Sequence, residues 1–171
     1  LDLIRQIGFK MVRQDLFQAE ELKFTYRLSS GMNPVATMRK GGARMNIFYK
    51  KEYNPQSLAA TGYGSLGETR IPDISLELYA SPQSSIPQVL IFDAKYREYD
   101  SQIIEKLDAY KLDIGRSDSR QSIVTYALAL WIDDRSEYRA YVLPVKTGGL
   151  YFVPNADFSA VKEILTNFTS A

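Results

Sequence analysis

The stretch Val89-Leu90-Ile91-Phe92-Asp93-Ala94-Lys95 says most about the fold of this chain. Its first four residues are apolar without alternation, which is typical of a strand covered on both faces in the middle of a sheet. Two charges follow at once, although charged residues usually avoid buried strands. Because residues two apart in a strand share a face, Asp93 and Lys95 are expected to lie about 6–7 Å apart. The pattern predicts a central strand over residues 88–96 that ends in a polar site.

The preceding apolar stretch, residues 71–79, alternates as a half-buried strand does. Ile74, Leu76 and Leu78 fall on one face, and Asp73, Ser75 and Glu77 fall on the other. If this strand pairs with residues 88–96, Asp73 converges on the edge that carries Asp93 and Lys95. Two carboxylates and one ammonium group would then meet at one end of a sheet.

Such a group of residues suits phosphodiester chemistry. Two carboxylates and a backbone carbonyl form a hard oxygen site for Mg²⁺ or Mn²⁺. The metal polarises the phosphodiester and lowers the pKa of a bound water, while a nearby Lys orients that water and stabilises developing charge. The alternative is that residues 93–95 are a solvated strand end and Pro72-Asp73 is a turn.

The composition excludes several other chemistries. The 171 residues contain neither His nor Cys, which excludes a Ser-His-Asp triad, a thiol nucleophile, a disulfide framework and zinc sites built from imidazole or thiolate. With 45% apolar and 24% charged residues, the chain is expected to form a single domain over residues 1–171. No apolar run approaches the ~20 residues of a membrane span. The lack of Cys fits a cytoplasmic protein, although many exported proteins also lack Cys.

The net charge of +1 hides an asymmetry between two parts of the chain. Residues 1–51 carry ten Lys and Arg against four Asp and Glu, whereas residues 52–171 carry eleven against sixteen. This division predicts a surface that faces a polyanion beside a carboxylate-rich part, or else it is chance clustering. Because the chain starts at Leu1 inside a helical pattern, we expect it to be a fragment of a longer protein.

The remaining patterns predict an α/β domain with a mixed sheet. We expect helices over residues 1–18 and 99–114, a last helix after Asp157, a turn over 29–33, a hairpin turn at Gly41-Gly42, a mobile loop over 54–69 and a turn at Gly148-Gly149. Strands are expected over residues 22–28, 35–38, 44–50, 122–132, 138–145 and 150–153.

Ile71-Pro72-Asp73, followed by the stretch from Val89 to Lys95, resembles the PD-(D/E)xK nuclease superfamily. The similarity is greatest to the McrC-type nuclease domain and its uncharacterised relatives. Three further stretches support this resemblance, which covers residues 44–132: residues 47–53 (Ile-Phe-Tyr-Lys-Lys-Glu-Tyr), residues 93–97 (Asp-Ala-Lys-Tyr-Arg) and residues 106–110 (Lys-Leu-Asp-Ala-Tyr). The resemblance implies a restriction-endonuclease-like core, a central mixed β-sheet flanked by helices in the order αβββαβ.

The resemblance also implies roles for individual residues. Asp73 and Asp93 would be catalytic metal ligands for Mg²⁺ or Mn²⁺, with the Ala94 carbonyl as a third ligand and Lys95 as the catalytic lysine. Many members add an acid from the first helix, for which Asp2, Glu20, Glu21 or a residue upstream of Leu1 are candidates. Glu77 shares the face of Asp73 and is either a further ligand or a solvated strand residue.

Basic and aromatic residues supply candidate DNA contacts. Arg39, Lys40 and Arg44 flank the glycine hairpin and are expected to reach backbone phosphates, or to be a solvated hairpin tip. Arg97, Lys106 and Tyr110 are expected DNA contacts near the metal, although Lys106 could equally be an exposed helix residue. Other tyrosines expected near the site either stack on bases or pack in the core: Tyr49, Tyr53, Tyr63, Tyr96 and Tyr99.

The expected function is that of a metal-dependent endonuclease that hydrolyses DNA in a restriction or phage-defence system. The expected partners are DNA and either a second copy of the chain or an AAA+ GTPase or ATPase subunit, with no membrane. Two alternatives stay open: a catalytically inactive nuclease fold that binds DNA or assembles a complex, and a scaffold without nucleic acid.

Overall fold

A computed structural model describes residues 1–15, 17–19, 26–28, 30–95, 101–132, 140–142, 147–152 and 158–170. Its centre is an eight-stranded mixed sheet with the order β1-β4-β5-β7-β8-β10-β12-β11. Strand β10 runs parallel to both of its neighbours, β8 and β12, and the other pairings are antiparallel. The strands of this sheet are β1 (Lys10–Gln14), β4 (Ala36–Lys40), β5 (Ala43–Tyr49), β7 (Ile74–Tyr79), β8 (Gln88–Lys95), β10 (Val124–Ile132), β11 (Ala140–Val142) and β12 (Thr147–Phe152).

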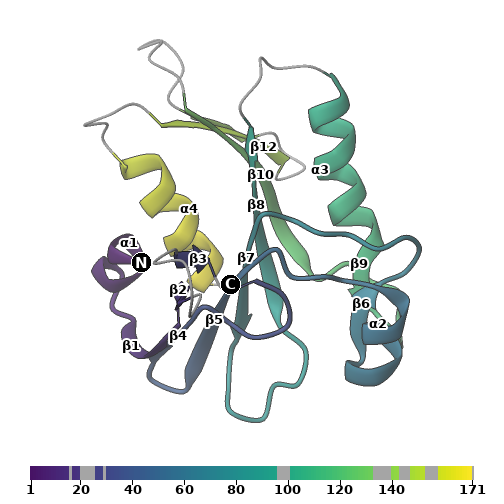
Figure 1. Ribbon diagram of the computed structural model, residues 1–171, viewed down its shortest axis with the longest axis horizontal. Helices are drawn as coiled ribbons and strands as arrows, with labels where there is room; N and C mark the ends of the chain where they lie inside the picture. The colour runs from purple at the N-terminus through teal and green to yellow at the C-terminus, as the bar shows by residue number, and fades with distance from the viewer. Residues whose placement is uncertain are drawn as a thin grey trace.

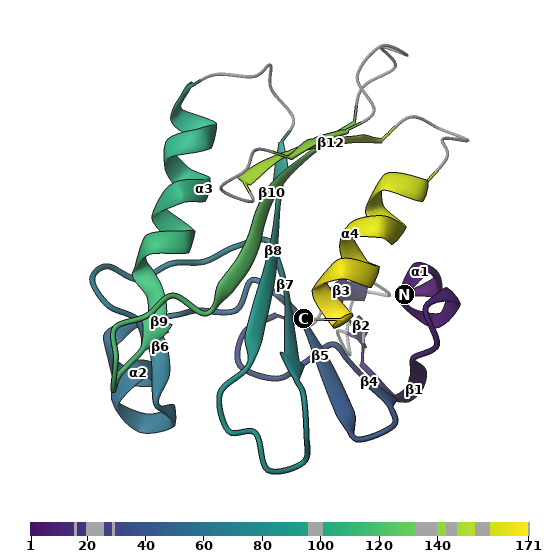
Figure 2. The same ribbon diagram turned by 180° about the vertical axis from the view of Figure 1, so that it is seen from behind.

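Helices cover both faces of the sheet (Figures 1 and 2). Helices α1 (Asp2–Gln6) and α4 (Ser159–Ser170) lie on one face. Helices α2 (Pro55–Thr61) and α3 (Ser101–Asp113) lie on the other, which we call the α3 face. Two small antiparallel sheets complete the fold: β2 (Phe17–Ala19) with β3 (Tyr26–Leu28), and β6 (Tyr63–Ser65) with β9 (Ile114–Arg116).

Strand β8 separates two hydrophobic cores. Leu90 and Phe92 belong to the core beneath α1 and α4, whereas Val89 and Ile91 belong to the core beneath α3. This two-sided burial explains why the sequence of β8 is apolar without alternation. It also fixes the direction of the next residue along the strand, because Asp93 follows Ile91 by two and therefore faces the α3 side.

The structure confirms the predicted α/β fold with a mixed central sheet between helices. The hairpin around Gly41-Gly42 joins β4 to β5, with Gly41 at a φ of +56°, where glycine is favoured. Within the helix expected over residues 99–114, apolar residues at helical spacing are buried: Ile103, Leu107 and Tyr110 in α3, and Ile114 at the start of β9. Trp131 is buried near the end of β10.

The prediction of one helix over residues 1–18 is correct only at its N-terminal end. Helix α1 ends at Gln6, Gly8 has a φ of +96°, and residues 10–14 form β1 on the sheet edge. The apolar spacing is helical, but pairing with β4 satisfies the backbone of these residues instead.

Two other segments also differ from the prediction. Residues 54–69 contain α2, which begins with a reciprocal cap between Asn54 and Ser57 and has Pro55 in its first turn, rather than forming only a loop. Gly148 and Gly149 lie inside β12, paired with β10, rather than in a turn. Outside the described residues are Asp157, residues 22–25 of one predicted strand, and parts of the 29–33 turn, the 138–145 strand and the 150–153 strand.

Within the described residues, the structure contains no helix with the length and apolarity to cross a membrane.

Candidate functional site

The two predicted metal-binding aspartates lie side by side at one end of the sheet. Asp73 directly precedes β7 and Asp93 is near the end of β8, and the antiparallel register pairs Ile74 with Phe92. The Asp73 Oδ2 atom accepts a hydrogen bond of 2.8 Å from the backbone N–H of Ala94. The convergence expected from the two strand patterns is therefore what the fold produces.

Asp93 is the buried centre of this site, with 1% of its side chain exposed. The Lys95 ammonium contacts one of its oxygens, and Lys106 Nζ lies 3.2 Å from both. Tyr110 donates to Asp93 Oδ1 over 3.4 Å. A buried carboxylate is costly unless it is paired, and here two ammonium groups and a phenol supply the pairing.

Helix α3 supplies two of these partners because Lys106 and Tyr110 are four residues apart on one helix face. Burial and the charge of Asp93 raise the pKa of Tyr110 to about 12, so its hydroxyl keeps its proton at neutral pH and can donate a hydrogen bond to Asp93. Burial alone would lower the pKa of Lys106, but its interactions with Tyr110 and Asp93 outweigh this effect and raise it. Lys106 is therefore a fixed positive charge, with 47% of its side chain exposed.

The donor set fits a hard divalent cation. Asp73 and Asp93 supply carboxylate oxygens. Ala94 lies between Asp93 and Lys95 at the end of β8, where its backbone carbonyl is the third candidate ligand. Carboxylates, backbone carbonyls and water are the ligands that Mg²⁺ and Mn²⁺ prefer. Among the described residues, no group of three or more acidic side chains is placed to hold a metal ion.

The structure does not bring an acid of the first helix to this site. Asp2 pairs with Arg5 on α1, which lies on the opposite face of the sheet from α3. Glu20 and Glu21 lie outside the described residues, as do Tyr96, Arg97 and Tyr99.

Glu77 is not a solvated strand residue, which was one of the two expectations for it. Its side chain is fully buried, four residues along β7 from Asp73, about 13 Å in an extended strand. Lys51 Nζ lies 2.5 Å from its Oε1, and three phenol groups donate to its two oxygens over 3.0–3.1 Å: Tyr53, Tyr63 and Tyr79. Burial and the nearby Glu77 charge raise the pKa of all three tyrosines, that of Tyr79 to about 12.

We call Lys51, Glu77 and these three tyrosines the Glu77 cluster. Sequence reasoning missed it because its members come from distant positions. The sequence held one signal, since the alternation of β7 puts Glu77 on the same face as Ser75 and Tyr79. The structure shows that this face is as buried as the apolar face. Tyr53 and Tyr63 were expected near the metal and instead belong to this cluster.

The predicted hairpin cations lie at the far end of the strands from Asp73 and Asp93. Arg39 and Arg44 are direct partners across β4 and β5, and Arg44 pairs with Tyr79, so both arginines are on the α3 face. The Arg44 guanidinium lies 4.4 Å from the centre of the Tyr79 ring. Lys40 faces the other side, where its ammonium donates to the Ile7 carbonyl over 2.9 Å.

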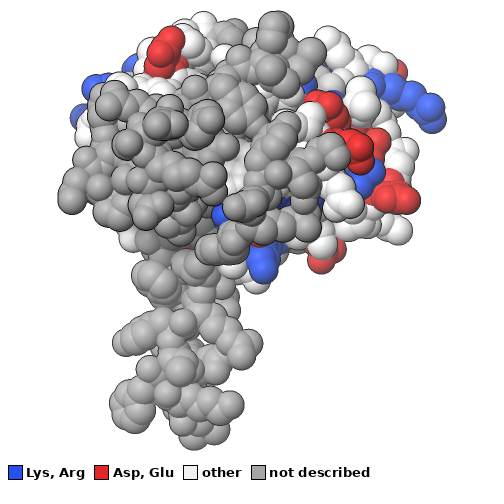
Figure 3. Space-filling view, turned by 90° about the horizontal axis from the view of Figure 1, so that it is seen from above, with Lys and Arg blue, Asp and Glu red and all other residues white. Residues whose placement is uncertain are grey.

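Lys50 lies at the end of the sheet that carries Asp73 and Asp93, and the sequence suggested no role for it. It follows β5 with a φ of +50°, and its backbone N–H donates to the Asp73 carbonyl over 2.9 Å. Lys50 is exposed, and its ammonium lies 5.5 Å from the centre of the Tyr49 ring. In the view from above, the described surface carries both positive and negative side chains rather than one sign (Figure 3).

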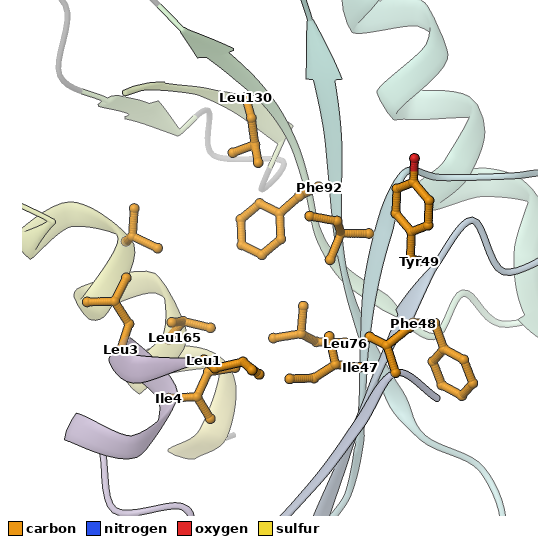
Figure 4. A pocket seen from close by; sticks show the side chains of 13 residues that line it. Leu1, Leu3, Ile4, Ile47, Phe48, Tyr49, Leu76, Phe92, Leu130 and Leu165 are labelled. Carbon is orange, nitrogen blue, oxygen red and sulfur yellow. The ribbon is translucent and has the colours of Figure 1, made fainter. Parts of the chain in front are cut away.

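An apolar cavity of about 300 Å³ lies on the opposite face of the sheet, between the strands and helices α1 and α4 (Figure 4). Leu3, Ile4 and Leu165 line it from the helices, and Ile47, Leu76 and Phe92 line it from the strands. Tyr49, a candidate for base stacking, also lines this cavity. None of the described residues that line it carries a carboxylate.

Comparison with known proteins identifies the family of this chain. A family model described as the PD-(D/E)XK nuclease superfamily matches residues 1–143. No curated protein sequence matches significantly, and neither does any solved structure. The matched region contains the whole aspartate and lysine site together with α3. The chain belongs to the PD-(D/E)XK nuclease superfamily.

Proposed function

We propose that the protein is a metal-dependent endonuclease that hydrolyses phosphodiester bonds of DNA. The observation that carries the proposal is the buried Asp93 carboxylate, held beside Asp73 and against the Lys95 and Lys106 ammonium groups. A structural ion pair needs one partner, whereas this edge gathers two carboxylates and two cations in a chain of nuclease ancestry.

In this proposal Asp73, Asp93 and the Ala94 carbonyl hold Mg²⁺ or Mn²⁺. The metal, when bound, supplies Lewis-acid activation of the phosphodiester and of water. Lys95 is the catalytic lysine, since its Nζ is within reach of the Asp93 carboxylate and can orient the attacking water and neutralise charge that develops on the phosphate. Lys106, half-exposed beside the same carboxylate, binds a phosphate oxygen of the substrate.

We further propose that this activity serves restriction or phage defence in the cytoplasm, as in McrC-type nucleases. A second copy of the chain, or an AAA+ GTPase or ATPase subunit, would be the partner that directs cleavage. The support for these finer assignments is the sequence similarity around Ile71-Pro72-Asp73 and residues 93–97.

The decisive test is cleavage of plasmid DNA, with an RNA of the same sequence for comparison, in Mg²⁺ and in Mn²⁺. We expect DNA cleavage that falls at least about 100-fold in Lys95→Ala, because positioned proton transfer and charge stabilisation contribute at least this much. Asp93→Asn should be as inactive. Lys162→Ala is the matched control, since Lys162 is an exposed lysine on α4 on the other face.

Unchanged cleavage by Lys95→Ala would contradict the catalytic assignment. DNA binding without cleavage in either metal would instead support a non-catalytic binding module, and the absence of both binding and cleavage would support a scaffold.

A further inference from the structure

A second cavity, of about 220 Å³, lies on the α3 face near the Glu77 cluster. Its floor comes from β5 and β7, and its walls come from α2 and the segment before β4. Because Glu77 is four residues from Asp73 along β7, the cavity lies about 13 Å from the aspartates on the same face of the sheet. The proposed reaction leaves this cavity without a role.

The lining of the cavity selects a neutral, planar ligand. Phe48, Tyr63 and Tyr79 supply aromatic surface. The charges at the floor already compensate each other, because Glu77 accepts from Lys51 and from three tyrosine hydroxyls. Among the described lining residues an ion would find no net charge, whereas an uncharged ring would find aromatic contacts.

Asn46 adds a directional polar group to this lining. Its amide oxygen accepts a hydrogen bond of 3.1 Å from the Thr37 hydroxyl, so its amide nitrogen is the atom that can donate to a ligand. A planar, neutral ligand with hydrogen-bond acceptors on its edge is the description of a nucleobase.

The cavity also lies between two places that suit phosphates. On one side are Asp73, Asp93 and the lysines of the proposed metal site. On the other is the half-buried Arg44, whose guanidinium lies over the Tyr79 ring. From Tyr49 to Arg44 the strand runs about 17 Å, the length of about five stacked nucleotides at ~3.4 Å each. A substrate strand that reaches from the aspartates to Arg44 therefore passes its bases over the cavity.

We propose that this cavity takes one nucleobase of the substrate strand out of the stack, a few nucleotides from the bond that is cut. The proposal rests on the proposed function in that the substrate is a nucleic acid. It assigns Asn46 as a specificity-determining residue that donates to the edge of the extruded base, while Phe48 and Tyr79 contact its face. The cavity thus gives a sequence or modification preference that the metal site alone lacks.

The test uses single-stranded and duplex oligonucleotides that carry one 5-iodouracil, moved along the strand one position at a time. Irradiation in the presence of Ca²⁺ instead of Mg²⁺ links the base to the aromatic side chain it contacts, and mass spectrometry identifies the linked residue. We expect one or two adjacent positions to link to Phe48, Tyr63 or Tyr79. Total binding to the same oligonucleotides is measured in parallel.

Two variants that fill the cavity mouth sharpen this test. Thr61→Trp places a large ring in the mouth from α2, and Met32→Trp does so from the opposite wall. Each should reduce the cavity cross-link about tenfold. Ala60→Trp is the matched control, because Ala60 is exposed on the same helix and does not line the cavity. Thermal unfolding measurements check that each variant is folded. Because there are two mouth variants, the test still works if one of them does not fold.

The outcomes separate this inference from the proposed function. Cross-links only to other parts of the protein, or cavity cross-links that survive in both mouth variants, overturn the inference while cleavage and binding are intact. Loss of the cavity cross-link in the mouth variants but not in Ala60→Trp supports it, even in a protein that binds without cutting. The absence of binding to every oligonucleotide overturns both.

Discussion

At the scale of single residues, Asp93 is the centre of the proposed site because of the side chains that surround it. The carboxylate is almost fully buried, and Lys95, Lys106 and Tyr110 all contact it. In the absence of metal these contacts compensate its charge, and they keep positive charges where a phosphate would bind. Whether Lys106 belongs to the reaction or is an exposed residue of α3 can be decided by kinetics.

Lys106→Gln should lower kcat/KM for DNA cleavage about tenfold, because a hydrogen bond to a charged group is lost. Most of the change should appear in KM if Lys106 binds a phosphate oxygen in the ground state. Steady-state cleavage kinetics measure this, with Lys162→Gln as the control. A kcat/KM equal to that of the unmodified protein would assign Lys106 to the solvated surface of α3.

At the scale of secondary-structure elements, the Glu77 cluster ties together segments that are far apart in sequence. Lys51 follows β5, Tyr63 is in β6, and Glu77 and Tyr79 are in β7. The same chain segment that contains Lys51 also contains Lys50, whose backbone N–H holds the Asp73 carbonyl. The cluster therefore holds in place the segment that contacts Asp73 at this end of the sheet.

Glu77→Gln should lower the free energy of unfolding by about 3–5 kcal/mol, because it leaves the Lys51 ammonium buried without its counter-ion. Urea denaturation measures the loss. The double variant Lys51→Met, Glu77→Gln should recover part of it, since no uncompensated charge remains. Asp2→Asn, which breaks an exposed ion pair, should change stability by less than about 1 kcal/mol. An equally small effect for Glu77→Gln would show that the pair is not a structural tie.

Raised tyrosine pKa values in the same elements predict the behaviour at high pH. A phenol with a raised pKa holds its proton more tightly when folded, so its contribution to stability is complete below pH 10 and is lost as pH rises from 10 to 12. The loss is at most about 1.4 kcal/mol per pH unit for each tyrosine, and smaller where water screens the hydroxyl. Tyr79→Phe should show a shallower decline of urea stability over this interval, whereas an unchanged slope would exclude Tyr79 as a contributor.

At the scale of the whole molecule, the two faces of the sheet carry different kinds of residues. The α3 face carries Asp73, Asp93, the Glu77 cluster and Arg44, whereas the opposite face carries the apolar cavity and helices α1 and α4. The basic character of residues 1–51 is divided between these faces, since Arg39 and Arg44 lie on one and Lys40 contacts Ile7 on the other.

DNA binding should therefore be sensitive to cations on the α3 face alone. Arg39→Gln should weaken binding and lower the slope of log affinity against log salt concentration by about one, as expected for the loss of one phosphate contact. Lys162→Gln, on the other face, should leave both unchanged. Fluorescence anisotropy at several salt concentrations measures the two quantities, and equal slopes for both variants would contradict this assignment of faces.

Much of the site could be predicted because its signals are local. Asp93 and Lys95 stand two apart at the end of a doubly apolar strand, and Pro72-Asp73 begins an alternating one. Their meeting needs only the pairing of two neighbouring strands. The short helix α1 and the strand over residues 10–14 could not be told apart from one long helix, because the apolar residues keep helical spacing. Only the pairing with β4 at the sheet edge makes residues 10–14 a strand.

The sequence by itself determined the central strand, the α/β class with a mixed sheet, the exclusion of His and Cys chemistry, and the aspartates and lysine of the candidate site. These follow from local periodicity and residue type, which act over a few neighbouring positions. Only the tertiary structure decided that Glu77 is buried, that Lys51 and three tyrosines surround it, and that Arg44 lies on the same face. Burial and pairing between distant segments depend on how the whole chain packs, because removing Glu77 from water is tolerable only where donors from other strands replace the water.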